Sequence, residues 1–201
     1  QIKTLVINDG STDNTLKVAK TIGVDHILSF SNNKGLAKAF SMGIDKCLEL
    51  GADIIVNTDA DNQYFGDDIK KLVDPIINNQ ADIVVGSRAI DKIEDFSWFK
   101  KKLQKIGSYF VRKLSNTDVQ DTVSGFRAFT RSAAMRINIF TGYSYTIESL
   151  IQFGYEKASI VSVPIRTNKN TRESRLFKSI PSFIANQLIT IIRSFSTYKP
   201  L

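Results

Sequence analysis

Two carboxylates separated by one residue, Asp59 and Asp61, follow a short apolar run. The run of Ile54, Ile55 and Val56 is typical of a buried strand in a parallel sheet. Side chains alternate along an extended backbone, so Asp59 and Asp61 are expected to point to the same side. The carboxyl end of such a strand is where open α/β sheets bind ligands, and carboxylate oxygens suit Mg²⁺ or Mn²⁺ arriving with phosphate. A solvated turn at the strand end is the alternative interpretation.

Charge is divided unevenly along the 201-residue chain, whose net charge is +7. Residues 1–90 carry nine basic and twelve acidic side chains, whereas residues 91–201 carry eighteen and eight. A basic second half suggests an anionic partner, which could be nucleic acid, a phosphorylated substrate or an anionic membrane surface. The single cysteine, Cys47, excludes a disulfide framework and fits a reducing compartment. Because His26 is the single histidine, we expect no histidine-based zinc site.

The chain contains neither a signal peptide nor an apolar run of about 18 residues that would span a bilayer. It begins at Gln1, inside an expected strand and without an initiating methionine. We therefore expect it to be a piece of a longer protein, shortened at both ends.

The first ninety residues alternate strand and helix patterns. Strands are expected over residues 2–7, 26–30 and 54–56, a strand and loop over 82–88, and helices over residues 15–22, 36–50 and about 69–77. Repeated βα units of this length predict a mainly parallel sheet with right-handed crossovers. The chain is therefore expected to belong to the α/β class.

Beyond residue 90 the pattern changes to a basic amphipathic helix. Its apolar residues recur at three- and four-residue spacing, at positions 96, 99, 103, 106, 110 and 114. A Gly-Phe-Arg segment, a helix over 145–153, a strand over 158–165, a basic stretch over 166–178 and a helix over 180–195 follow. The apolar stripes of the first and last helices have two interpretations: packing on the domain core, or contact with a membrane interface.

Five segments of the chain together resemble the family 2 glycosyltransferases. They are residues 8–13, 32–37, 59–63, 86–88 and 121–127, in the order in which that family carries them. The resemblance is strongest to the dolichol-phosphate mannosyltransferase-like and polyprenyl-phosphate branch. It implies a GT-A fold, which is a Rossmann-like, mainly parallel sheet flanked by helices. It also implies a nucleoside diphosphate sugar donor, a bound Mg²⁺ or Mn²⁺, and inversion at the anomeric carbon.

Two departures from the family pattern stand out. The first acidic residue of the usual Asp-Asp-Gly-Ser turn is Asn8, which leaves Asp9 as the only carboxylate there. The family's central N-terminal strand, whose loop helps to hold the nucleotide, is missing from this chain. Because base recognition draws on that strand, a UDP-linked and a GDP-linked donor are both compatible with the sequence.

The resemblance implies a donor side built from two turns. Asp9 would contact the base or ribose, and Asp59 would face the diphosphate. The predicted nucleotide-binding residues also include Gly10, Ser11, Lys34 and Gly35. Helix capping is the alternative role for Ser11, and a helix N-terminus explains the spacing of Lys34 and Gly35 equally well.

Asp59, Asp61 and Gln63 are the predicted metal and diphosphate site. A bound metal would stabilise the charge of the departing diphosphate, and Arg88 would add a charge-assisted contact to the same oxygens. We expect Asp61, Arg88 and Asp121 to be the catalytic residues. For Arg88 the alternative is a surface arginine that simply follows a strand.

On the acceptor side, guanidinium groups match phosphate geometry, and the predicted acceptor-binding residues are Ser124, Arg127, Arg172 and Arg175. A lipid phosphate is largely anionic at neutral pH and needs no strong protein base. A sugar hydroxyl does need one, and Asp121 and Glu148 are the candidates. The alternatives are that Asp121 caps or orients the Gly-Phe-Arg loop and that Glu148 is simply a carboxylate on a helix face.

The leading hypothesis treats residues 1–201 as one catalytic domain, with a nucleotide-sugar half (1–90) and an acceptor half (91–201). It is a metal-dependent inverting glycosyltransferase that uses polyprenyl phosphate, peripheral to or anchored at the cytoplasmic face of a membrane. Transfer to a saccharide in surface-polysaccharide synthesis is the second hypothesis, and a non-catalytic nucleotide-binding module is the third. We expect no nucleic-acid partner, because no RNA-binding signature accompanies the basic residues and such a role leaves Asp59 and Asp61 unexplained.

Overall fold

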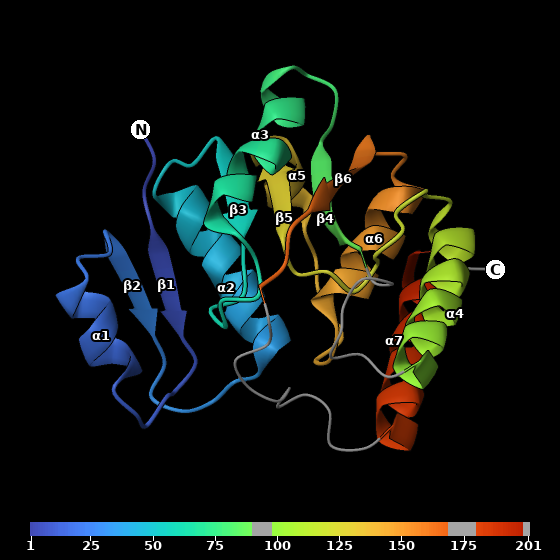
Figure 1. Ribbon diagram of the computed structural model, residues 1–201, viewed down its shortest axis with the longest axis horizontal. Coiled ribbons are helices and arrows are strands. Elements are labelled where there is room, and N and C mark those ends of the chain that lie inside the picture. Colours follow the sequence, from blue (N-terminus) through green and yellow to red (C-terminus); the bar gives the residue numbers. More distant parts are fainter. Residues whose placement is uncertain (90–97, 169–179, 199–201) are drawn as a thin grey trace.

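The computed structural model describes residues 1–89, 98–168 and 180–198, in which strands and helices alternate (Figure 1). In chain order the elements are β1 (Leu5–Asn8), α1 (Thr15–Thr21), β2 (His26–Ser29), α2 (Leu36–Glu49), β3 (Ile54–Asn57), the 3₁₀ helix η1 (Gly66–Asp68), α3 (Ile69–Ile77), β4 (Ile83–Arg88), α4 (Trp98–Ser115), β5 (Arg127–Thr130), α5 (Arg131–Arg136), α6 (Tyr145–Tyr155), β6 (Ile160–Ile165) and α7 (Ile180–Tyr198). The predicted elements are present at or near their expected bounds. The sequence patterns do not predict β5 or α5.

The strands form two sheets, and the larger one is mixed. β1 and β2 make a parallel pair of their own, and the other strands are ordered β3-β5-β4-β6. β5 runs antiparallel to both β3 and β4, whereas β4 and β6 are parallel. The α/β class and the mainly parallel arrangement are confirmed, with one exception: β5 runs against its two neighbours, β3 and β4. Since β5 and β6 pair with β4, both halves of the chain build this sheet.

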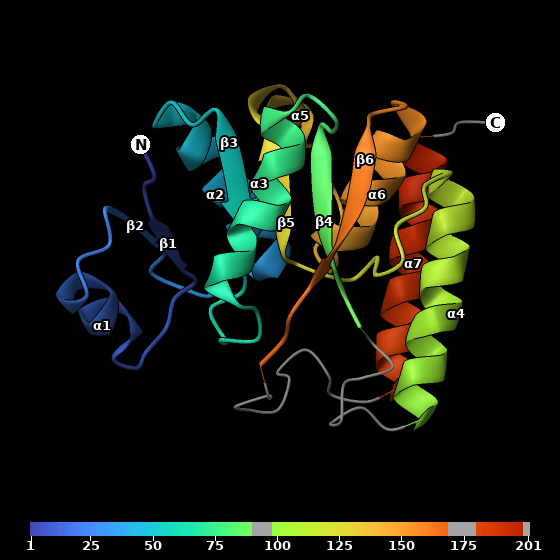
Figure 2. The same ribbon diagram turned by 45° about the horizontal axis from the view of Figure 1, so that its top comes forward.

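Alternating side chains of the larger sheet form two cores. Ile83, Val85 and Phe129 point to the face that is covered by α2, α5 and α6. Val84 and Ala128 point to the opposite face, where they pack with residues of α3. These five side chains are almost fully inaccessible to solvent. The sheet therefore lies between two helical layers (Figures 1 and 2), as its apolar alternation requires.

Helix α4 turns part of its apolar stripe outward. Ile106 and Phe110 are 45% and 55% exposed, whereas Ser108, Val111 and Ser115 are buried. The buried face is narrow because α4 and α6 approach closely: a β-carbon at Gly154 would overlap the Ser115 backbone. Packing of the whole stripe on the core, one of the two interpretations, is therefore wrong for this helix.

Helix α7 lies beside α4 in both views (Figures 1 and 2). Like α4, it exposes apolar side chains and buries hydroxyl-bearing ones. Leu188 and Ile192 are 53% and 63% exposed, whereas Thr190 and Ser194 are buried. The buried hydroxyls donate to helix carbonyls four residues earlier, which satisfies them without a partner helix. In the described parts of the chain, no helix combines the length and hydropathy that crossing a bilayer demands.

Candidate active site

Asp59 and Asp61 lie in the turn that leaves the carboxyl end of β3. Asp59 is partly buried, and desolvation raises the pKa of its carboxyl group; the negative charge of Asp61 raises it further. The positive charges of Arg88 and Arg127 act in the opposite direction. Asp61 accepts a hydrogen bond from the Gln63 amide at 3.0 Å. The two carboxylates thus form a repelling pair that a cation would stabilise.

The segment around Gly125 approaches Asp59 without a side chain between them. A β-carbon at Gly125 would lie 2.8 Å from Asp59 Oδ2 and 2.9 Å from the Tyr145 hydroxyl. Asn57, the last residue of β3, donates to the Gly125 carbonyl at 2.8 Å and to the Tyr145 hydroxyl at 2.9 Å. Phe40 of α2 stacks on Tyr145 with ring centroids 3.9 Å apart. Residues from four elements therefore define the inner wall of this site.

Arg88 and Asp121 form a bidentate ion pair. Arg88 Nε donates to Asp121 Oδ2 at 2.6 Å, and Nη2 donates to Oδ1 at 2.9 Å. Both side chains are buried. Burial alone would lower the pKa of Arg88, but the charge and hydrogen bonds of Asp121 outweigh it and raise the pKa above its usual value.

This pairing corrects the predicted role of Asp121 as a catalytic base. Its carboxylate is fully inaccessible and already accepts both guanidinium N–H groups, so it cannot accept a proton from a substrate hydroxyl without breaking the pair. Loop orientation, the alternative for Asp121, is what the structure shows. The predicted phosphate contact of Arg88 stays a prediction.

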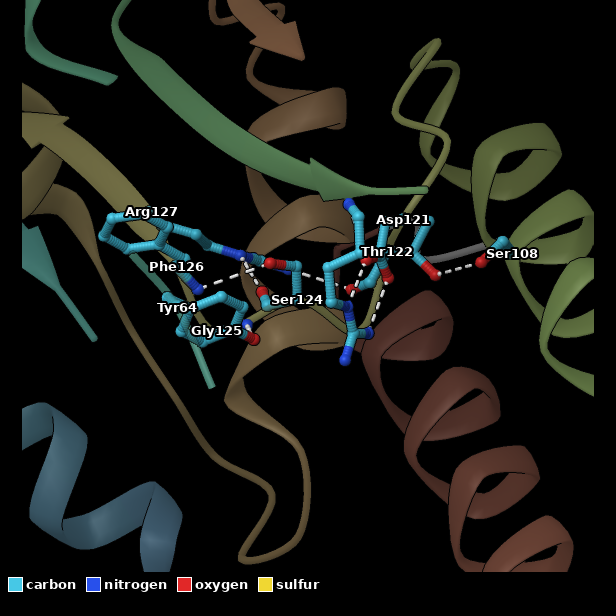
Figure 3. A network of polar contacts seen from close by, with 9 residues as sticks. Tyr64, Ser108, Asp121, Thr122, Ser124, Gly125, Phe126 and Arg127 are labelled. Atoms are coloured by element: carbon cyan, nitrogen blue, oxygen red, sulfur yellow. Dashed lines mark hydrogen bonds and ion pairs between the residues drawn. The ribbon is translucent and has the colours of Figure 1, made fainter. Parts of the chain in front are cut away.

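Arg127 is also completely buried and points into the protein (Figure 3). Its guanidinium donates to the carbonyls of Ser124, Thr146 and Thr122 at 2.8 Å and to the Ser149 hydroxyl at 2.9 Å. All four acceptors are uncharged, and burial lowers the pKa of Arg127 to about 10. The side chain fastens the 122–124 loop to α6.

The predicted acceptor cluster is therefore not assembled. Arg127 has no exposed surface, and Ser124 is buried with its hydroxyl accepting the Phe126 amide at 3.3 Å (Figure 3). The structure does not support acceptor binding by either residue, because their polar atoms serve the protein's own loop. Arg172 and Arg175 lie outside the described residues.

Glu148, the second candidate base, is likewise engaged. It is buried on α6, where it accepts hydrogen bonds from the amides of Phe140 and Thr141 at 2.7 and 2.9 Å and from the Thr141 hydroxyl at 2.6 Å. It is a carboxylate on a helix face, as the alternative interpretation describes, and it holds the loop before α6.

The predicted nucleotide residues of the first turn do come together. Asp9 accepts hydrogen bonds from the amides of Lys34 and Gly35 at 2.7 and 3.0 Å, at the start of α2. Gly10 has a φ of +69°, and a β-carbon there would lie 2.5 Å from the Asn32 backbone. The Ser11 amide donates to the Asn8 side chain at 3.2 Å. The two segments thus form one packed corner, in which Asp9 caps α2.

The residues present fit a divalent cation that is shared with a diphosphate. Within the described ranges, no group of three or more His, Cys, Asp or Glu side chains could hold a metal by itself. Asp59 and Asp61 supply two hard oxygen ligands. Mg²⁺ typically binds one or two carboxylates and completes its coordination with water and substrate phosphates. A role for the Gln63 side chain in this site stays a prediction.

Comparison with known families decides the class of the protein. The model of the family described as "Glycosyl transferase family 2" matches residues 1–137. The chain belongs to glycosyl transferase family 2. The resemblance inferred from the five segments is thereby confirmed, and with it the assignment as a glycosyltransferase.

Relatives within this family include enzymes named for lipid-phosphate substrates. One is the UDP-N-acetylglucosamine–dolichyl-phosphate N-acetylglucosaminyltransferase of Methanococcus voltae, 35% identical over 81% of this chain and 73% of its own length. Another is the polyprenol monophosphomannose synthase of Mycolicibacterium smegmatis, 27% identical over 82% of this chain. The chain spans 66% of that second relative's length.

Similarity to a solved structure confirms the GT-A fold. Glucosyl-3-phosphoglycerate synthase from Mycobacterium tuberculosis, crystallised with Mn²⁺, UDP-glucose and phosphoglyceric acid, superposes with a TM-score of 0.70. The match covers 96% of this chain and 67% of that one, at 17% identity, so it is a likeness of fold alone.

Sequence reasoning misses three residues of the site: Asn57, Tyr64 and Tyr145. Asn57 had a usable signal, since it is the polar residue that ends the apolar run two positions before Asp59. Tyr64 stacks on Phe126 with centroids 5.0 Å apart, and its hydroxyl accepts the Gly125 amide at 3.4 Å. The two tyrosines meet the motif only through long-range packing, for which the sequence has no local signal.

Proposed function

We propose that this chain is the catalytic domain of a metal-dependent, inverting glycosyltransferase that moves a sugar from a nucleoside diphosphate to a polyprenyl phosphate. The partly buried, mutually repelling pair of Asp59 and Asp61 after the end of β3 carries the donor half of the proposal. The names of the relatives, which act on dolichyl, polyprenol and undecaprenyl phosphates, support the acceptor half.

The state of the two candidate bases favours a phosphate acceptor over a sugar hydroxyl. A hydroxyl nucleophile needs a base within hydrogen-bond reach. Asp121 is paired with Arg88, and Glu148 is spent on backbone amides. A phosphate monoester has a second pKa of about 6 and arrives already deprotonated at neutral pH. The acceptor that fits these residues is therefore one that brings its own charge.

Each part of the site then has a stated task. Asp59 and Asp61 would hold the divalent cation, which when bound supplies Lewis-acid stabilisation of the diphosphate leaving group. Gly125 keeps a narrow space open beside Asp59, and Asn57 fixes the Gly125 carbonyl. Arg88, held rigid by Asp121, places a buried positive charge close enough to Asp59 to oppose its raised pKa.

Thermal unfolding with nucleotide and metal tests the donor half. The melting temperature should rise when UDP or GDP is added together with Mn²⁺ or Mg²⁺, and not with either component alone. Asp61→Ala should remove the gain, because one of the two carboxylate ligands is lost. The matched control is Asp74→Asn, which removes an exposed carboxylate on α3. A nucleotide-induced shift that needs no metal and persists in Asp61→Ala contradicts the metal site.

Product analysis with the full-length protein tests the acceptor half. Sugar should be transferred from the nucleotide donor to a short-chain polyprenyl phosphate, and the product should release sugar under mild acid. Transfer to a saccharide but not to the lipid phosphate would support surface-polysaccharide synthesis instead.

The outward apolar surfaces of α4 and α7 support a membrane-peripheral location. Ile106, Phe110, Leu188 and Ile192 are all about half exposed or more, and α4 carries basic residues at 102, 105, 112 and 113. Apolar side chains with interspersed lysine and arginine favour an anionic lipid surface. We place this surface at the cytoplasmic leaflet, where polyprenyl phosphates would meet nucleotide sugars.

A further inference from the structure

The loop that follows Asp61 has an unusual backbone that must be held from outside. Asn62 adopts a φ of +59°, in the left-handed region that asparagine tolerates better than most residues. Asp61 and Gln63 flank it, and the Gln63 amide donates to Asp61 at 3.0 Å. The direction of the Asp61 side chain therefore depends on the conformation of a strained neighbour.

The residues that follow β6 fasten this loop along its length. The Asn168 side chain donates to the Asn62 carbonyl at 2.9 Å, and the Asn168 amide donates to the Gln63 carbonyl at 2.9 Å. The preceding residue, Thr167, forms an isolated antiparallel bridge with Tyr64. The carbonyls of the two residues that follow Asp61 are thus tied to one residue that is 106 positions away from Asn62.

The end of the loop is closed by an ion pair between Arg166 and Asp68. The Arg166 amide donates to Asp68 Oδ2 at 2.7 Å, and Nε and Nη2 donate to Oδ1 at 3.0 and 2.7 Å. Asp68 is fully buried and also accepts from Lys71 at 3.0 Å. The Arg166 guanidinium lies 4.7 Å from the ring centroid of Phe65. Hydrogen bonds from Arg166 and Lys71 hold the pKa of Asp68 well below its usual range, so the pair is ionised at neutral pH.

We propose that Arg166 and Asn168, with Asp68 as anchor, are positioning residues that set the placement of Asp61 relative to Asp59. We call residues 166–168 the latch. The proposal rests on the proposed function, because it concerns the loop that would hold the cation.

The physical reason lies in the difference between the two carboxylates. Asp59 is fixed by its burial beside Gly125, close to the rigid end of β3. Asp61 lies beyond it in a turn, where the latch and the Gln63 amide hold the neighbouring backbone. Residues that orient metal ligands typically change metal affinity by about 10–100-fold when they are replaced. Loosening the latch should therefore weaken cation binding with little effect on the core.

Two variants test the latch independently. Asn168→Ala removes the bond to the Asn62 carbonyl but keeps the backbone bond to Gln63. Arg166→Met removes the guanidinium but keeps an unbranched side chain over Phe65 and the backbone bond to Asp68. The matched control is Asp74→Asn, because the pair of Asp74 with Lys70 is also on α3, is exposed, and touches no part of the loop.

The first measurement is amide hydrogen exchange of the metal-free chain over residues 58–65. Exchange should be faster by about tenfold in both latch variants and unchanged in the control, while the melting temperature stays close to that of the original chain. The second measurement is Mn²⁺ affinity in the presence of UDP or GDP by calorimetry. It should fall by about tenfold or more in the latch variants alone.

The outcomes separate the latch from the proposed function. If the original chain binds Mn²⁺ with nucleotide and both variants match it in affinity and exchange, the latch is overturned. If the original chain binds no Mn²⁺, the metal-dependent function fails, and hydrogen exchange alone decides whether residues 166–168 order the loop. Faster exchange throughout the protein, with a lowered melting temperature, would identify a general stability effect and also contradict the latch.

Discussion

Gly125 lies so close to Asp59 that a β-carbon on the glycine would stand 2.8 Å from the carboxylate oxygen Oδ2. The glycine is thus needed for space, and its φ is not in the left-handed region that would make it a conformational requirement. The segment from 124 to 126 and the end of β3 therefore share one tight contact, locked by the bond from Asn57 to the Gly125 carbonyl.

Replacing Gly125 by alanine should displace Asp59 and weaken metal binding more than it weakens the fold. Overpacking at a buried position typically costs about 1–3 kcal/mol, and a displaced ligand lowers metal affinity by about tenfold or more. Calorimetry with Mn²⁺ and nucleotide measures the affinity, and chemical denaturation measures the stability. Gly107→Ala on α4 is the control, since a β-carbon there meets nothing within 4 Å. Equal Mn²⁺ affinity in the two variants would contradict this placement of Asp59.

Removing the charge of Asp59 should stabilise the metal-free protein at neutral pH. Burial, aided by Asp61, raises the pKa of Asp59 above 3.8 in the folded state. A raised pKa means that the folded state disfavours the ionised form. The resulting stability is present at low pH and is lost as pH rises from about 4 through the folded-state pKa.

Asp59→Asn should therefore melt at a higher temperature than the original chain in EDTA, and the difference should grow between pH 4 and pH 7. For a chain of this size each 1 kcal/mol corresponds to about 2–4 °C. The variant should at the same time lose the gain caused by Mn²⁺ and nucleotide. The control Asp74→Asn, at an exposed position, should show no such pH trend. If Asp59→Asn melts at a lower temperature than the original chain at pH 7, burial is not the dominant influence on the pKa of Asp59.

The order of strands and helices could be predicted because local patterns determine it. The helix over 69–77 has its expected bounds, since its apolar spacing and the following turn are local features. β5 was not predicted, because its residues Arg-Ala-Phe-Thr lack the run of consecutive apolar residues that marks β1 and β3, which are equally short. Its insertion between β3 and β4 is what makes the sheet mixed.

The position of Asp59 and Asp61 just after a strand could be predicted, because the apolar run before them is a local feature; their role as metal ligands stays a prediction. Prediction failed where the partner of a charged group decides its role. Asp121 and Arg88 are 33 positions apart, and nothing in either motif indicates that they neutralise each other. Arg127 faces inward because β5 begins there, so the missed strand also caused the wrong acceptor assignment.

Breaking the buried pair of Arg88 and Asp121 on one side should be more damaging than removing both partners. Asp121→Asn or Arg88→Met leaves an unpaired buried charge, which typically costs about 3–5 kcal/mol. The double variant Arg88→Met/Asp121→Leu removes both charges and should be more stable than the sum of the single changes indicates. Chemical denaturation of the four proteins gives the coupling energy. Additive effects would mean that the pair does not interact in solution.

The apolar surface formed by α4 and α7 should bind anionic vesicles. Phe110→Ser and Ile192→Ser together remove two side chains that are 55% and 63% exposed in the protein. Burying such a side chain in an apolar environment is worth about 1.5–3 kcal/mol in full, so partial insertion of two should change vesicle partitioning on the order of tenfold. The folded stability should hardly change, because neither side chain is part of the core.

Sedimentation with vesicles of mixed neutral and anionic lipid measures the partitioning. Lys105→Glu should weaken it further and reduce its salt dependence, since each basic residue near an anionic surface contributes about 1 kcal/mol. The control is Ile22→Ser, which changes a 70% exposed side chain directly after α1. Helix α1 lies at the other end of the molecule from α4 and α7 (Figure 1). If Ile22→Ser weakens binding as much as the α4 and α7 changes, adsorption is unspecific. If neither Ile22→Ser nor the α4 and α7 changes alter vesicle binding, α4 and α7 face something other than lipid.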